Sequence, residues 1–102
     1  MTADDVTKII QTELSGVEGT SDVRAALVEP YRQQFLLMDS YEQMSSAAKS
    51  VVEYWVVAAT PMYLEFFDPH SQEFGLAEPL PSEGLPQTVG VRGDLVSTFR
   101  AM

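Results

Sequence analysis

The stretch MYLEFFDPHSQEFGLAE, residues 62–78, decides the fold of this chain. Two apolar runs flank a polar link, in which Asp68 can accept hydrogen bonds from the following backbone and Pro69 presets one dihedral angle. This pattern is typical of a β-hairpin. Residues 52–59, just before it, are rich in β-branched and aromatic side chains and predict another strand. Together the three runs predict an antiparallel meander.

The segment before the meander predicts helices and a further strand. Apolar residues at helical spacing predict a helix over residues 4–15, and Ser21 is a plausible N-cap for a short second helix that Pro30 limits. Residues 31–38 fit both a strand and a helical stripe, and we favour the strand because Pro30 opens it and a polar pair closes it. A capping-box pattern then predicts a short helix over residues 41–49.

The segment after the hairpin predicts a loop, an edge strand and a last helix. Three prolines and a glycine make residues 78–86 a surface loop, residues 87–91 can add a strand, and Asp94 opens a final helical turn or two. We therefore expect one globular domain, residues 1–102, of the α+β class. It would have an N-terminal helix or helices, an antiparallel β-meander of four to five strands and a short C-terminal helix.

Composition excludes several classes of protein. The 102 residues carry a formal charge of −9 and contain no cysteine, so a disulfide framework, a thiolate metal site and a cysteine nucleophile are ruled out. The first ten residues hold two acids where a secretory signal would be basic, and no apolar run has membrane-spanning length. We expect a soluble, cytoplasmic protein that binds neither a membrane nor, because of its charge, nucleic acid directly.

Both faces of the predicted meander are partly apolar, so both need a cover. Since two short helices hardly suffice for both faces, the second face is a candidate interface. We place its aromatic anchors and neighbouring acids at Trp55, Tyr63, Phe67, Glu53 and Glu65. Filling of the core beneath the helices is the competing interpretation of the aromatic residues. Glu53 and Glu65 are expected at offset, solvated positions, because like charges directly opposite each other destabilise a sheet.

Acidic residues surround this predicted interface. Between Lys49 and Arg92 there is no lysine or arginine, and six acids give the window a formal charge of −6. A clustered negative field favours a basic partner, although acids that merely solvate strand edges and loops give the same pattern.

No residue pattern predicts catalysis, a metal or a cofactor. Asp68, His70 and Ser71 lie within one turn and cannot converge from separate elements as a catalytic triad requires. Asp68, His70 and Glu73 match no dedicated metal site, because structural zinc needs cysteine or several histidines. A phosphate-binding loop is also missing.

We therefore expect a small, acidic, non-enzymatic protein-interaction module, such as an adaptor, an inhibitor or an immunity-type protein. It would bind a basic protein partner, or a second copy of itself as a homodimer, through the aromatic face. One alternative is an apolar ligand pocket between sheet and helices, with Tyr41, Tyr54 or Trp55 as walls. A weaker alternative is an acidic mimic of nucleic acid.

Overall fold

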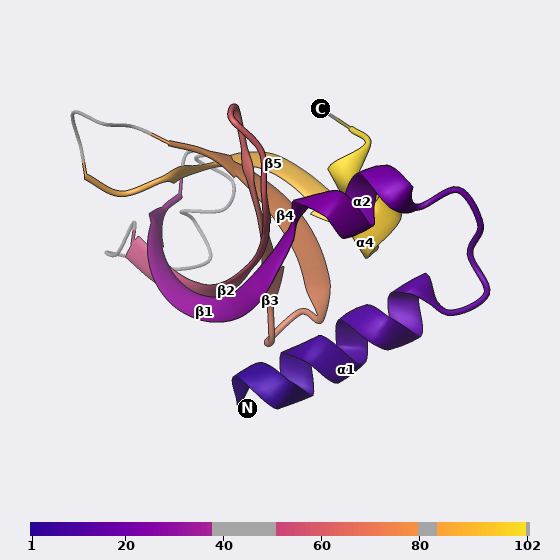
Figure 1. Ribbon diagram of the computed structural model, residues 1–102. Coiled ribbons are helices and arrows are strands. Elements are labelled where there is room, and N and C mark those ends of the chain that lie inside the picture. Colours follow the sequence, from indigo (N-terminus) through magenta and orange to yellow (C-terminus); the bar gives the residue numbers. More distant parts are fainter. Residues whose placement is uncertain (38–50, 80–83, 102) are drawn as a thin grey trace.

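The computed structural model describes residues 1–37, 51–79 and 84–101, and its helices lie together on one side of a curved sheet (Figure 1). The helix predicted for residues 41–49 lies outside the described residues. Helix α1, Ala3–Leu14, confirms the first predicted helix. Thr2 and Asp5 form its capping box, in which the Asp5 carboxylate accepts from the Thr2 N–H at 2.8 Å and the Thr2 hydroxyl accepts from the Asp5 N–H at 3.3 Å.

Helix α2, Ser21–Ala26, is followed by strand β1, Leu27–Leu36, without a loop. The preference for a strand over a helix in this region is therefore confirmed. The strand begins earlier than expected, so Pro30 lies inside it. The register of β1 against the next strand shifts between Leu27 and Tyr31, and proline is tolerated in a strand at such irregularities because it has no N–H to donate.

The predicted meander is confirmed. Its strands are β2 (Val51–Ala59), β3 (Leu64–Asp68), β4 (Glu73–Glu78) and β5 (Gln87–Gly93), and each is antiparallel to the strand before it. The sheet then closes into a barrel, because Leu36 of β1 pairs in parallel with Gln87 of β5. The Leu36 N–H donates to the carbonyl of Pro86 at 2.9 Å.

Closure of the barrel explains how both apolar faces of the meander are covered. One face turns inward, where Phe35, Tyr54, Val56, Phe66 and Ala77 form the barrel cluster. The other face packs against the helices and forms the helix-side cluster. Its buried members are Val6, Ile10, Leu14, Val23, Trp55, Val57, Ala58, Phe67, Phe74, Leu95 and Phe99. The sequence-based expectation of an uncovered second face is wrong, since the sheet covers one face itself.

Helix α4, Leu95–Phe99, confirms the predicted closing helix. Asp94 caps it by accepting from the Ser97 N–H at 2.8 Å. Glu13 of α1 accepts from the Leu95 N–H at 2.9 Å, so α1 supplies a second cap. Within the described part of the chain, no helix combines the length and apolar character that crossing a bilayer requires.

Candidate functional site

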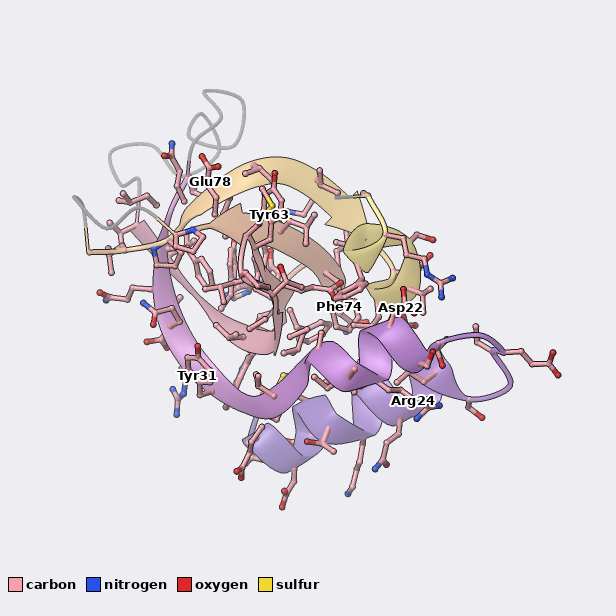
Figure 2. The ribbon with its side chains drawn as sticks, turned by 45° about the horizontal axis from the view of Figure 1, so that its top comes forward. Asp22, Arg24, Tyr31, Tyr63, Phe74 and Glu78 are labelled. Carbon is pink, nitrogen blue, oxygen red and sulfur yellow. The ribbon has the colours of Figure 1, made fainter. Side chains whose placement is uncertain are left out.

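Two of the predicted interface aromatics belong to the core. Trp55 and Phe67 are paired on neighbouring strands, and both face the helices. Only 8% of Trp55 and 1% of Phe67 is exposed, which corrects the expectation that an open face presents them. In Figure 2, Phe74 lies between the sheet and the helices, and its ring centroid is 5.0 Å from that of Phe67. Tyr31, by contrast, is 46% exposed.

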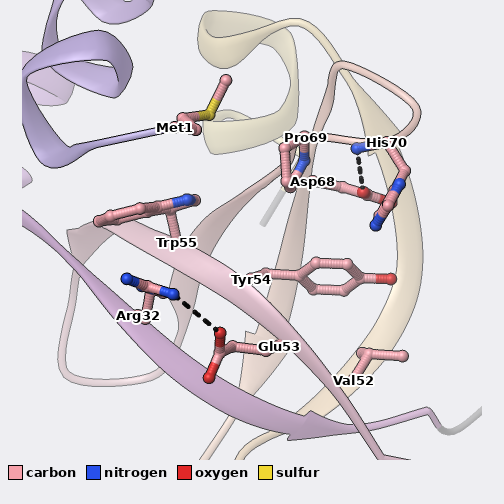
Figure 3. A pocket seen from close by; sticks show the side chains of 9 residues that line it. All are labelled: Met1, Arg32, Val52, Glu53, Tyr54, Trp55, Asp68, Pro69 and His70. Atoms are coloured by element: carbon pink, nitrogen blue, oxygen red, sulfur yellow. Dashed lines mark hydrogen bonds and ion pairs between the residues drawn. The ribbon is translucent and has the colours of Figure 1, made fainter.

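The exposed edge of Trp55 nevertheless contributes to a groove, here called the tryptophan groove (Figure 3). The Arg32 guanidinium lies 5.5 Å from the centroid of the Trp55 ring, and its Nη1 is 3.7 Å from Oε1 of Glu53. The groove has a volume of about 730 Å³. Its described lining residues are Met1, Arg32, Val52, Glu53, Tyr54, Trp55, Asp68, Pro69 and His70. Because one arginine faces one glutamate here, the groove carries charges of both signs.

A second groove is lined by acids, and we call it the acidic groove. It lies between α1, the turn that joins β3 to β4, and the start of α4, and it has a volume of about 640 Å³. Its described lining residues are Met1, Ile9, Glu13, Phe67, Gln72, Glu73, Phe74, Gly93 and Asp94. Three of these carry carboxylates and none is a lysine or arginine. Met1 lines both grooves, so the grooves adjoin.

The β3–β4 turn between the grooves is held by Asp68. Its Oδ1 accepts from the His70 N–H at 2.9 Å, as Figure 3 shows, and its Oδ2 accepts from Arg92 Nη1 at 2.9 Å. Burial alone would raise the pKa of Asp68, but the hydrogen bonds from Arg92 and the turn outweigh it and lower that pKa. His70 itself is exposed, so its backbone, and not its ring, holds the turn.

Sequence reasoning missed Arg92 as a structural residue. Its guanidinium lies 5.3 Å from the ring centroid of Tyr54 and 5.2 Å from that of Phe66, and its Nη2 donates to the Tyr54 hydroxyl at 3.2 Å. Burial opposes the charge of Arg92, yet the hydrogen bonds to Tyr54 and Asp68 raise its pKa. In the sequence, Arg92 is the first lysine or arginine after Lys49, at the end of a long acidic segment. A buried carboxylate such as Asp68 needs a nearby cation, and this position offered one.

Glu65 departs most from its expected, solvated position. It is 2% exposed on β3, and neither carboxyl oxygen has a hydrogen-bond partner in the described structure. Ala58 lies opposite Glu65, so Glu65 is offset from Glu53, as expected. Burial, together with the negative charges of Asp94 and Glu13, raises the pKa of Glu65 to about 9.

Tyr63, the remaining predicted interface residue, is half-buried beside Glu65. Its carbonyl accepts from the Thr60 N–H at 2.9 Å, which closes the connector between β2 and β3. The small space that Tyr63 and Glu65 line has no volume that a water molecule could occupy. Two of the walls expected for an apolar ligand, Tyr54 and Trp55, line the tryptophan groove instead, and Tyr41 lies outside the described residues.

Asp68, His70 and Ser71 share one turn, in which the Asp68 carboxylate accepts from the backbone N–H groups of His70 and Ser71. Within residues 1–37, 51–79 and 84–101, no group of His, Asp and Glu side chains is arranged to hold a metal ion. What the arrangement offers is binding surface: two adjoining grooves, one of them acidic. Comparisons with protein-family models, with curated proteins and with solved structures found no match, so the chain's own geometry carries the interpretation of this site.

Proposed function

We propose that this chain is a non-enzymatic protein-interaction module that binds a basic segment of a partner protein in the acidic groove. The observation that carries the proposal is the composition of that groove. Glu13, Glu73 and Asp94 line it together with apolar side chains, and no lysine or arginine is among its described lining residues. The tryptophan groove, where Arg32 pairs with Glu53, lacks such a bias.

The lining suits a lysine or arginine side chain, which has an apolar stem and a charged end. Ile9 and Met1 can pack against the stem, while Glu73, which is exposed, can receive the charge. Glu13 and Asp94 each accept one hydrogen bond from the start of α4. A carboxylate has about four acceptor positions, so both retain capacity for a cationic donor.

The charge of the whole chain supports a basic occupant. The net charge of −9 attracts a basic partner over long range and raises its association rate at low salt. A second copy of this chain would bring the same charge to the groove. Homodimerisation through the acidic groove is therefore electrostatically less favourable than binding a basic partner.

Matched peptides test the proposal. We expect a peptide of alternating lysine and leucine to bind, and its counterpart with glutamate in place of lysine not to bind. Chemical-shift mapping should place the basic peptide at Ile9, Glu73 and Phe74. Binding should weaken as salt is raised, since salt screens charges that lie near the surface. Equal binding of both peptides, or shifts confined to another surface, would contradict the proposal.

Charge reversal provides the matched control. Glu73→Lys should weaken binding of the basic peptide by about fivefold or more, equivalent to about 1 kcal/mol for a partly exposed charge pair. Glu18→Lys changes the net charge equally at an exposed position outside the groove and should have a much smaller effect. Similar losses in both variants would mean that general attraction, and not the groove, binds the peptide. Sedimentation of the free chain measures whether a second copy competes for the surface.

A further inference from the structure

Glu65 is a buried carboxyl group with no described partner, and it lies beneath the closing helix. Its described neighbours around the small space beside it include Ala58 and Ala59 of β2, Leu76 of β4 and Phe99 of α4. These four are apolar, and Thr60 and Tyr63 of the connector line the same space. An ionised carboxylate that is buried without a hydrogen bond or a cation costs several kcal/mol, so this environment suits only the neutral acid.

The charged groups that act on Glu65 all oppose its ionisation. Glu13 approaches from α1, and Asp94 approaches from the cap of α4. The phenol of Tyr63, from the connector, lies along the same space. Arg100, the cation that follows α4, is directed elsewhere, because its Nη2 lies 3.0 Å from Asp22 and also donates to the Gly19 carbonyl. No cation is among the described groups that act on Glu65.

Helix α4 is the element above Glu65 with the least support of its own. It has five residues, Leu95–Phe99, which is too short for a helix to be stable without tertiary contacts. Its start depends on Asp94 and Glu13, and its packing depends on the buried Leu95 and Phe99. The barrel strands, by contrast, are hydrogen-bonded to neighbours on both sides. Moving α4 is thus the smallest rearrangement that admits water to Glu65.

We propose that Glu65 is a proton-dependent latch for α4: the neutral carboxyl stays buried beneath the helix, and loss of its proton favours a state in which α4 has moved away and water reaches β3. The latch does not depend on the proposed binding function. Since the carboxyl retains its proton up to a pH of about 9, the closed state is the one present at neutral pH. Because opening exposes the carboxyl to water, where its pKa is the ordinary 4.5, the balance shifts towards the open state as the pH rises to about 9 and then levels off.

Distance measurements between two spin labels test the latch. The chain has no cysteine, so Ser97→Cys on α4 and Gln34→Cys on β1, both at exposed positions, can carry the labels. We expect one narrow distance distribution at about pH 7 and an additional, longer distance at about pH 10, where a carboxyl of this kind is ionised. Glu65→Gln in the same labelled chain should keep the single narrow distance at both pH values. Glu53→Gln, on the exposed side of β2, should behave like the parent.

A longer distance at high pH in all three backgrounds would overturn the proposal, and so would its absence from all of them. If Glu65→Gln does not fold, an NMR titration of the parent chain still tests the latch. The carboxyl carbon of Glu65 and the amide signals of α4 can be followed together by NMR as the pH is raised. A common midpoint supports the latch, whereas different midpoints, or signals that change throughout the barrel at once, overturn it.

Discussion

Two glutamates in apolar strands show how the position of a residue in the fold determines whether its side chain is exposed or buried. Glu53 is exposed and lies 3.7 Å from Arg32, whereas Glu65 is buried without a described partner. Their local sequences are alike, since each stands among aromatic and aliphatic residues. What separates them is the position of α4, whose Phe99 covers Glu65, and the tryptophan groove, which Glu53 lines. Neither is a local property, so the sequence pattern could not distinguish the two acids.

Glu65 predicts an unusual dependence of stability on pH. Its pKa is raised to about 9 in the folded chain, from an ordinary value of 4.5. Between these values the folded chain holds a proton that the unfolded chain has released, so stability falls as the pH rises. The contribution of one such group is about 1.4 kcal/mol per pH unit. Glu65→Gln should remove that slope when the free energy of unfolding in urea is measured from about pH 5 to about pH 8.5.

Glu53→Gln is the matched control, because it removes a carboxyl from an exposed position on the neighbouring strand. This variant should keep the slope of the parent. Parallel pH profiles for the parent and Glu65→Gln would mean that the buried carboxyl does not retain its proton, and would remove the basis of the latch as well.

Among the helices and strands, the correct predictions came from local sequence patterns. The β3–β4 hairpin was predictable because its turn needs only Asp68 and its neighbours, and Asp68 does accept from the His70 N–H. Helix α1 was predictable from the spacing of Val6, Ile10 and Leu14, which are all buried. The early start of β1 was not predictable, because Pro30 reads as a boundary unless the shifted register is known.

Helix α4 shows how a distant element completes a short one. Glu13 of α1 accepts from the Leu95 N–H at 2.9 Å, across 82 positions of sequence. Glu13→Ala should therefore lower the free energy of unfolding by about 0.5 to 2 kcal/mol, the usual cost of losing a helix cap. The measurement is best made at about pH 6, where Glu65 is neutral and its repulsion by Glu13 plays little part.

Glu13→Gln should retain most of that stability, since an amide oxygen can still accept from the Leu95 N–H. Glu18→Ala, at an exposed position, controls for the loss of one negative charge. Equal stability of the Glu13→Ala and Glu18→Ala variants would show that α4 does not need the cap from α1.

At the scale of the molecule, the residues that the structure describes form two hydrophobic clusters that share strands. Tyr54 and Val56 of β2 belong to the barrel cluster, while Trp55 and Val57 belong to the helix-side cluster. Strand β3 is divided in the same way by Phe66 and Phe67. This alternation was visible in the sequence, but the closure that buries one face was not, because it depends on the pairing of Leu36 with Gln87, which joins the first strand of the sheet to the last.

Shared strands predict a single cooperative transition. Phe35 is fully buried in the barrel cluster, and its ring centroid lies 5.1 Å from that of Phe66. Phe35→Ala should destabilise the chain by about 3 to 5 kcal/mol, because it removes a large side chain and leaves a cavity. Trp55, the only tryptophan, reports on the opposite cluster. In Phe35→Ala, the unfolding midpoint followed by Trp55 fluorescence should therefore move to lower urea concentration. The midpoint followed by circular dichroism should move by the same amount.

Met62→Ala, at a position that is 70% exposed, should leave both signals unchanged. If Phe35→Ala shifts the circular dichroism transition but leaves the Trp55 transition in place, the two clusters unfold separately. The side chains that alternate along β2 and β3 would then not couple the two clusters. Coincident shifts would mean instead that a change inside the barrel reaches the helices through the backbone of the same two strands, the route by which both faces of this small sheet are held together.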